Sequence, residues 1–453
     1  MLANLLKNRR AFAGVWFALL LFPLVSVAAP RIEHWTTPQG VPVYFVRSDS
    51  LPMVDVRLLF DAGSARDGAT PGLAQLTGSL LSEGADGQSA ETLARGFEDV
   101  GAQFSAGVSQ DSAYLSLRSL SDKARLASAL DGLARILRAP DFPEDAFVRE
   151  RDRQLLAIRA RAQSPGEVAD EAFMSALFGT HPYAHPVDGN AVSVAALTRD
   201  QVRAFHQRHY TTGTALIALV GALDRVQAEA LAERLAGSLP KGEALPALPP
   251  VLPLDTSRRI DVPFPAQQAS ILIGQPGIAR LDPDYFPLYV GNHILGGSGF
   301  SSRLVSTIRE ERGLAYSVYS YFMPMRQAGP FQMGMQTKLA QGEMAIGLLE
   351  ADLKRFIAEG PSEEELAHAH KNILGGFALR LDSNRKLVEN IAAIGYLGLP
   401  LDYLDRYRDR VAAVTREDIK RAFAKHLRPE TMVTVVVGGP QATEQGDAQG
   451  KQP

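Results

Sequence analysis

Two stretches of the chain repeat the same order of apolar and polar positions at an interval of 217 residues. They are Leu197–Val220 and Val414–Val437, and they align without a gap. In each, a threonine precedes a segment with apolar residues at helical spacing, and a predominantly apolar run follows after a turn. Threonine is a favoured helix N-cap, and a short apolar run bounded by turn residues is typical of a buried strand. Each copy therefore predicts a capped helix, a turn and a buried strand.

A second pair of matching segments lies near the start of each half. Strand-like runs lead into Gly63–Arg66 and Gly277–Arg280, which share the sequence Gly-x-Ala-Arg. Helices are predicted after both, over Gly72–Leu81 and Tyr285–Leu295. One unit of roughly 210 residues has therefore been duplicated. Since each unit mixes strands with helices, we predict an α+β fold of two related domains.

Composition marks the joint between the two units. Residues 239–253 (LPKGEALPALPPVLP) are rich in proline, leucine and alanine, which is typical of a linker. We therefore place one domain over residues 30–238 and a second over residues 254–440. Residues 441–453 are polar and poor in apolar side chains, so we expect a disordered tail there.

The first 29 residues have the pattern of a secretory signal peptide. Three basic residues precede a short apolar run, and small residues follow over Ser26–Ala29. Cleavage after Ala28 is favoured over cleavage after Ala29, because the latter leaves Pro30 directly after the cut. An uncleaved N-terminal anchor is the alternative, but the apolar run is short and has no stop-transfer flank. We expect export to the periplasm.

Cysteine content and charge narrow the classes of function. An exported chain without cysteine has no disulfides, so hydrophobic cores must stabilise it. The formal net charge is −3, and it becomes −6 once the three bases of the signal segment are removed. This charge argues against nucleic acid or anionic lipid as the main partner. No second apolar run of about 20 residues follows, so we expect the mature chain to have no membrane span.

The stretch Gly291–Ser320 carries the strongest candidate chemistry. Its three loop glycines, Gly296, Gly297 and Gly299, allow positive φ angles and the close approach of another segment. The apolar residues after them recur at helical spacing and predict a short helix that ends at Gly313. Apolar and polar residues then alternate, which predicts a strand.

Arg309 falls in the last turn of that helix, and Tyr316 falls in the strand, on one face with Leu314 and Val318. Folded back on each other, a guanidinium and a phenol could converge on one carbonyl or oxyanion. Two other interpretations stay open, since an arginine there complements the helix dipole and a strand tyrosine is often half-buried packing. A glycine loop can also hold phosphate, but neither G-x-x-x-x-G-K-[ST] nor a strand followed by G-x-G-x-x-G is present.

The two halves differ at the positions of this pair. At an interval of 212 residues, Phe97 aligns with Arg309 and Phe104 aligns with Tyr316. Two phenylalanines at that spacing indicate core packing. An arginine and a tyrosine beside a glycine loop need a reason beyond packing, which favours a functional pair.

Together these features resemble the M16 peptidases, the family of insulinase, pitrilysin and the mitochondrial processing peptidase. The resemblance rests on GFSSRL followed by Arg309 and GLAYSV, on the duplicated unit, and on GTHPYAHPVDG over Gly179–Gly189. It extends from about residue 31 to about residue 440. It implies that each domain has a mixed, largely antiparallel sheet with helices packed on it, and that the chain forms half of a clamshell.

M16 peptidases carry an H-x-x-E-H motif in the first half, whose two histidines hold Zn²⁺ and whose glutamate activates water. The matching helix here has Gln75 and Ser79 at the histidine positions and Gly78 at the glutamate position. The family's third ligand, a glutamate farther along the chain, matches the stretch Leu155–Ala157. Amide, hydroxyl and alkyl groups cannot replace imidazole and carboxylate at a zinc site. The resemblance therefore implies a degenerate zinc motif and no metal in this chain.

The remaining histidines do not supply another metal site. His181 and His185 are four residues apart, but a proline follows each and breaks any helix that would align them. His206 and His209 are expected on the solvated face of an amphipathic helix.

In the family, an arginine and a tyrosine of the second half reach across the clamshell, bind the substrate carbonyl and stabilise the oxyanion. Those positions match Arg309 and Tyr316. The loop Gly296–Gly299 matches the one with which the non-catalytic subunit of the mitochondrial enzyme contacts substrate. Some bacterial members divide these parts between two chains, one with H-x-x-E-H and one with the Arg/Tyr pair.

The leading hypothesis is a metal-free subunit of a heterodimeric, periplasmic M16-type zinc peptidase that acts on peptides or unfolded proteins. A zinc-binding partner of similar fold would bring the metal, its ligands and the general base, so this chain would be inactive alone. The alternative is a catalytically inert peptide-binding or scaffold protein of the cell envelope, which would not need Arg309 or Tyr316. A chain active by itself would need a nucleophile or base, and the sequence has neither cysteine nor a serine in G-x-S-x-G.

Overall fold

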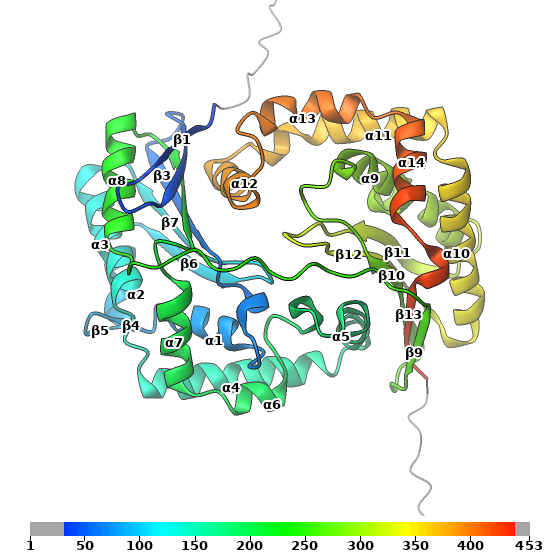
Figure 1. Ribbon diagram of the computed structural model, residues 1–453, viewed down its shortest axis with the longest axis horizontal. Coiled ribbons are helices and arrows are strands. Elements are labelled where there is room, and N and C mark those ends of the chain that lie inside the picture. Colours follow the sequence, from blue (N-terminus) through cyan, green and yellow to red (C-terminus); the bar gives the residue numbers. More distant parts are fainter. Residues whose placement is uncertain (1–30, 440–453) are drawn as a thin grey trace, which may run out of the picture.

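The computed structural model describes residues 31–439, and its framework is two β-sheets, one from each half of the chain (Figure 1). The predicted signal segment and the predicted tail lie outside these residues. The first sheet has the strand order β1-β2-β8-β3-β7-β6, and the second has the order β9-β13-β10-β12-β11. No helix within residues 31–439 is long and apolar enough to cross a membrane.

The strands of the first sheet are β1 (Glu33–Thr36), β2 (Pro42–Arg47), β3 (Met53–Phe60), β6 (Gln103–Val108), β7 (Ala113–Leu120) and β8 (Ala215–Gly221). The strands of the second sheet are β9 (Arg258–Val262), β10 (Gln268–Pro276), β11 (Ala315–Phe322), β12 (Pro330–Lys338) and β13 (Val433–Val437). The first-half helices are α1 (Leu73–Leu80), α2 (Ala90–Glu98), α3 (Lys123–Arg138), α4 (Glu144–Arg161), α5 (Pro165–Phe178), α6 (Ala191–Ala195), α7 (Arg199–His209) and α8 (Arg225–Gly237). The second-half helices are α9 (Tyr285–Asn292), α10 (Gly342–Glu359), α11 (Glu363–Gly376), α12 (Asn384–Leu397), α13 (Tyr403–Ala412) and α14 (Arg416–His426).

The strands of the internal repeat occupy the same place in the two sheets. β8 is parallel to β2 on one side and antiparallel to β3 on the other, and β13 lies in the same way between β9 and β10. The helices before them, α7 and α14, begin with capping boxes at Thr198 and Thr415. The remaining neighbours within each sheet are antiparallel. The predicted α+β fold of two related units with mixed, largely antiparallel sheets is confirmed.

Each sheet is covered on one face by a helix from the other half. α12 packs on β2, β3 and β8 of the first sheet, and α5 packs on β10 and β13 of the second (Figure 1). Ile391 of α12 shares a hydrophobic core with Leu216 and Val220. Phe173 of α5 shares another core with Val435. The two halves are therefore joined by an exchange of helices that the chain order does not reveal.

A polar network also joins the halves. Arg326, between β11 and β12, donates from Nη1 to Asp61 Oδ2 over 2.9 Å and from its backbone N–H to Asp111 Oδ2 over 2.8 Å. Arg66 donates to both carboxylate oxygens of Asp61 over 2.7 Å. The Tyr396 hydroxyl of α12 donates to the Asp111 carbonyl over 2.6 Å. Two guanidinium groups thus compensate the charge of Asp61 where the halves meet.

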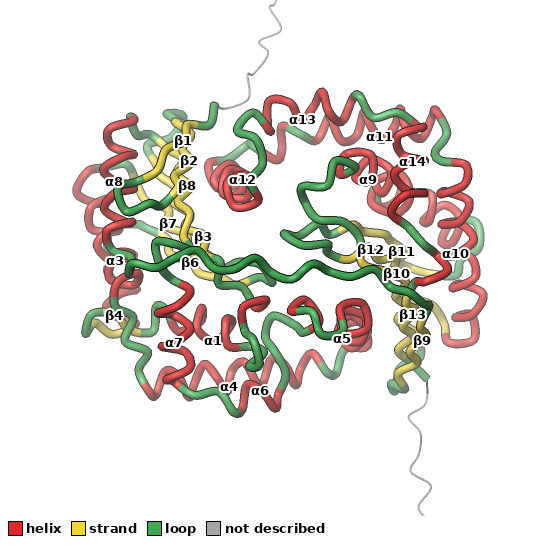
Figure 2. Tube along the Cα trace, in the orientation of Figure 1, coloured by secondary structure: helices red, strands yellow, loops and turns green. Residues whose placement is uncertain are grey.

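The predicted linker, residues 239–253, contains no helix or strand and runs across the molecule between the halves (Figure 2). His181 Nε2 lies 2.9 Å from the Pro249 carbonyl oxygen. Gln327 Nε2 donates to the Leu248 carbonyl over 3.1 Å. The segment is therefore hydrogen-bonded to side chains of both halves.

The solvated position expected for His206 and His209 is wrong, because both side chains are only 5% exposed. The His206 ring stacks on Tyr210 at a centroid distance of 5.1 Å and meets Phe142 edge-on at 5.5 Å. Its Nε2 atom is buried without a hydrogen-bond partner in the part of the chain that the structure describes. Burial lowers the pKa of His206 to about 4. The sequence pattern missed this because Phe142, which packs against the His206 ring, is distant in sequence.

Acidification should destabilise the fold through His206. In the unfolded chain an imidazole titrates with a pKa near 6.5, whereas burial lowers the pKa of His206 to about 4, so the unfolded state binds the proton first. The contribution to stability is complete above about pH 6.5 and is lost as the pH falls toward about 4, to a total of roughly 3 kcal/mol. Urea unfolding at a series of pH values measures this loss.

The matched control is His206→Phe, which removes the titrating group and keeps a ring against Tyr210. The wild-type chain should lose unfolding free energy on acidification that the variant retains. Burial raises the pKa of Asp67 to about 7, so acidification stabilises the fold through this group. Asp67 is present in both proteins, so its contribution cancels when their pH profiles are compared. Parallel pH profiles for the two proteins would contradict the prediction.

Candidate functional site

The candidate site is built by the segment between α9 and β11. α9 continues into a π-helical turn over His293–Gly297, and a 3₁₀ turn follows over Gly299–Ser301. A second π-helical segment, Val305–Glu310, precedes β11. The predicted order of glycine loop, short helix and strand is found, although the helix is wound more widely than an α-helix. Such π-helical turns are rare and are frequent at functional sites.

The glycines of this segment serve two purposes, close packing on a strand and a positive φ angle. At Gly296 a Cβ atom would lie 2.4 Å from the backbone nitrogen of Ser320, so the loop packs directly on β11. Gly299 has a φ of 63°, and Gly313, which ends the helical segment, has a φ of 62°. The expected freedom for positive φ is used at Gly299 but not at Gly296 or Gly297.

A β-bulge sets the direction of the Tyr316 side chain. On β12 a single residue lies between the partners of Ala315 and Val318, so two residues of β11, Tyr316 and Ser317, oppose one. The expected alternation, with Tyr316 on the same face as Val318, is therefore wrong. Val318 is buried, whereas Tyr316 is 83% exposed. Bulges commonly redirect a side chain beside an active site.

The structure places Arg309 beside Tyr316. Arg309 Cζ lies 5.2 Å from the centroid of the Tyr316 ring and 4.7 Å from the centroid of the Phe300 ring. Within residues 31–439, no carboxylate is paired with this guanidinium. Its N–H donors are therefore not taken up by a carboxylate, and the Tyr316 phenol O–H is a further donor on the adjacent ring. Donors of this kind stabilise an oxyanion when they reach the same oxygen.

Phe300 was not among the candidate residues from the sequence. It lies on the 3₁₀ turn, and its side chain is 74% exposed. The available signal was a bulky apolar residue placed between the glycines and serines of a loop.

The equivalent positions in the first half show the same geometry with different chemistry. Phe97 and Phe104 stack with ring centroids 5.4 Å apart and planes 9° apart. Phe97 is buried on α2, and Phe104 lies on β6, the edge strand that corresponds to β11. The alignment of the halves at an interval of 212 residues thus matches their spatial arrangement.

The residues at the zinc positions of α1 do not fit a zinc ion. Gln75 Nε2 donates to Ser79 Oγ over 3.4 Å, so these two side chains contact each other. At Gly78 a Cβ atom would lie 2.7 Å from Val108 Cγ2, so a glutamate there would require the Val108 side chain to shift. At these three positions the helix therefore offers neither the histidine ligands nor the glutamate base of a zinc site.

The stretch of α4 that matches the third ligand is apolar. Leu155 packs against the first-half core, and Leu156 is 65% exposed. One position earlier, Gln154 Nε2 donates to the carbonyls of Gly72 and Asp188 over 3.0 Å and 2.8 Å. At this place α4 supplies hydrogen bonds that hold the start of α1 rather than a metal ligand.

Another group of potential ligands lies elsewhere in residues 31–439, formed by Asp282, Asp284 and His426. Lys425 Nζ and His426 Nε2 lie 2.6 Å and 2.9 Å from Asp284 Oδ2. Burial raises the pKa of Asp284, but the hydrogen bonds from Lys425 and His426 outweigh burial and leave the pKa lowered. A lysine within the group makes it an ion-pair network.

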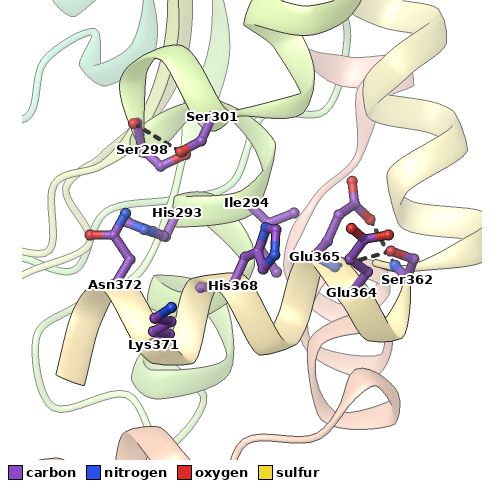
Figure 3. A pocket seen from close by; sticks show the side chains of 11 residues that line it. His293, Ile294, Ser298, Ser301, Ser362, Glu364, Glu365, His368, Lys371 and Asn372 are labelled. Carbon is purple, nitrogen blue, oxygen red and sulfur yellow. Dashed lines mark hydrogen bonds between the residues drawn. The ribbon is translucent and has the colours of Figure 1, made fainter. Parts of the chain in front are cut away.

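A cavity of about 600 Å³ lies between the glycine loop and α11 (Figure 3). His293 Nε2 is buried and has no hydrogen-bond partner among the described residues, and burial together with Arg380 lowers the pKa of His293. Polar side chains that line the cavity include His293, Ser298, Ser301, Glu364, His368, Lys371 and Asn372. The volume suits several residues of a peptide rather than an ion. The turn that carries Phe300 thus borders both this cavity and Arg309.

Two family models match the chain. Residues 43–190 match the model described as insulinase (peptidase family M16), and residues 196–373 match the model described as the peptidase M16 inactive domain. The chain is 40% identical to a peptidase M16 inactive domain of known crystal structure from Pseudomonas fluorescens, with a TM-score of 0.87. That match covers 90% of this chain and 98% of the other.

Curated relatives extend the comparison. The chain is 28% identical over 381 residues to the uncharacterized zinc protease SCO5738 of Streptomyces coelicolor, which is 82% of each chain. It is 26% identical over 426 residues to the non-peptidase homolog YmxG of Helicobacter pylori, which covers 92% of this chain and 97% of that one. With both halves matched by family models and the fold shared over nine-tenths of its length, this chain belongs to the M16 peptidase family.

Proposed function

We propose that this chain is the non-metal-binding subunit of a heterodimeric M16-type zinc peptidase. The observation that carries the proposal is Arg309 beside an exposed tyrosine, without a carboxylate partner among residues 31–439, in a chain whose zinc positions hold Gln75, Gly78 and Ser79. Loss of the ligands together with retention of the pair favours a division of labour between two chains.

In this division, the partner subunit has a similar fold and supplies Zn²⁺, its ligands and the general base. Arg309 and Tyr316 donate hydrogen bonds to the substrate carbonyl and to the oxyanion that develops from it. Gly296, Gly297 and Gly299 belong to the loop that contacts the substrate, a peptide or unfolded protein. The sequence of residues 1–29 supports a periplasmic location.

Reconstitution tests the proposal directly. The purified chain, the product of a neighbouring reading frame if that frame encodes an M16 chain with H-x-x-E-H, and their mixture are assayed for hydrolysis of an unfolded protein, and the metal content of each chain is measured. Activity is expected only in the mixture, with zinc only in the neighbour. A mixture in which the glutamate of the neighbour's H-x-x-E-H is replaced by glutamine is the matched control and should be inactive.

A catalytically inert peptide-binding or scaffold protein of the cell envelope is the second candidate. The relative named as a non-peptidase homolog supports this second candidate, since the match covers 92% of this chain. If the chain neither binds the neighbouring subunit nor raises its activity, the peptidase proposal fails and this second function replaces it.

A further inference from the structure

Arg309 is in contact with two exposed aromatic rings. Phe300 is 74% exposed and Tyr316 is 83% exposed, and their centroids lie 4.7 Å and 5.2 Å from Arg309 Cζ. Both distances are within the range of a cation–π contact. We call Phe300 and Tyr316 together the aromatic clamp.

The clamp offers a way to hold an arginine without using its donors. A carboxylate partner would fix the guanidinium but would occupy its N–H groups and compensate its charge. A ring face attracts the cation electrostatically and accepts no strong hydrogen bond from it. Arg309 therefore keeps its charge and its donors for a substrate oxygen.

The turn that carries Phe300 is itself constrained. Gly299 has a φ of 63°. The Ser302 hydroxyl donates to the Gly299 carbonyl over 2.7 Å, and the Ser301 hydroxyl donates to Ser298 Oγ over 3.1 Å. These bonds hold the turn that presents the phenylalanine to Arg309.

We infer that Phe300 is a positioning residue that fixes the Arg309 guanidinium before the substrate binds. The inference rests on the proposed function for its effect on catalysis, but not for its effect on the motion of Arg309. Pre-organisation of this kind lowers the cost of ordering a flexible side chain in the transition state.

The test compares Phe300→Leu, which keeps an apolar side chain of similar size, with Phe300→Tyr, which keeps the ring. In the reconstituted peptidase, Phe300→Leu should lower kcat about 2- to 5-fold, and Phe300→Tyr should retain the wild-type kcat. In the isolated chain, the NMR order parameter of the Arg309 Nε–Hε bond should fall in Phe300→Leu and stay unchanged in Phe300→Tyr. Thermal unfolding of both variants should match the wild type, because residue 300 is exposed.

The outcomes distinguish failure of the inference about Phe300 from failure of the proposed function. Unchanged kcat and unchanged order of Arg309 in Phe300→Leu would overturn the inference. Equal losses in the leucine and tyrosine variants would also overturn it, since the ring would then not be the cause. If Arg309→Ala has no effect on kcat, the proposed function fails, and the order parameter alone decides whether the clamp exists.

Discussion

Replacement of Arg309 by alanine should lower the kcat of the reconstituted peptidase by about 10²–10³, and Tyr316→Phe should have an effect of similar size. Both groups are proposed to donate to an oxygen whose negative charge grows toward the transition state, so their contribution is larger there than in the bound substrate. kcat should therefore fall more than KM rises. Steady-state cleavage of a fluorogenic peptide measures both constants.

The chain offers matched controls for both substitutions. Arg312 is an exposed arginine three residues beyond Arg309, and Tyr321 is a partly exposed tyrosine of the same strand as Tyr316. Arg312→Ala and Tyr321→Phe should leave kcat unchanged. Tyr316→Phe keeps the ring against Arg309 and removes the hydroxyl, so it isolates the phenol O–H.

Three results would count against these roles. Full activity of both the Arg309→Ala and Tyr316→Phe complexes would exclude the pair from the chemistry. A change confined to KM would reduce the pair to substrate binding. A comparable loss in the Arg312→Ala control would show that the charge of the segment matters, rather than the position of one guanidinium.

The internal repeat and much of the candidate site could be predicted because both depend on residues that are close together in the chain. The caps at Thr198 and Thr415 follow from local hydrogen bonds, and so the internal repeat was visible as sequence. Arg309 and Tyr316 are only seven residues apart, with Gly313 at the end of the helical segment between them. That short connection was enough to predict that the two side chains approach each other.

What was missed depends on partners that are distant in sequence. The bulge at Tyr316 exists only in the pairing of β11 with β12, and no local pattern encodes that register. His206 was expected to be solvated because polar residues surround it in the sequence, whereas Phe142, which is distant in sequence, packs against its ring. A role for Phe300 could not be predicted from the sequence, because it depends on the contact of its ring with Arg309 in the structure. The zinc positions could be predicted only in part. The sequence shows that the ligands are absent, but it does not show that Gly78 lies against Val108.

The exchange of α5 and α12 is the largest feature that the sequence did not reveal, and it gives the second prediction. Fragments 31–238 and 254–439 follow the predicted domain division, but neither should fold alone. Four side chains of α12 are at most 6% exposed and belong to the core that includes first-sheet strands: Leu387, Val388, Ile391 and Ile394. Burying each contributes about 1.5–3 kcal/mol, so together they contribute roughly 6–12 kcal/mol. That sum is as large as the whole stability of an ordinary domain, about 5–15 kcal/mol.

Separated from its partner, the first fragment would expose the strand face under α12, and the second would expose the face under α5. Each purified fragment should therefore lack near-ultraviolet circular dichroism and a cooperative urea transition, whereas co-expression should yield a complex with both. The fit at the exchange is close, since a Cβ atom at Gly395 of α12 would lie 2.4 Å from Tyr44 Cε2. The complex should accordingly recover the native signal rather than a loose association. A cooperative transition in the isolated 31–238 fragment would show instead that the first half is an independent domain and that α12 only covers it.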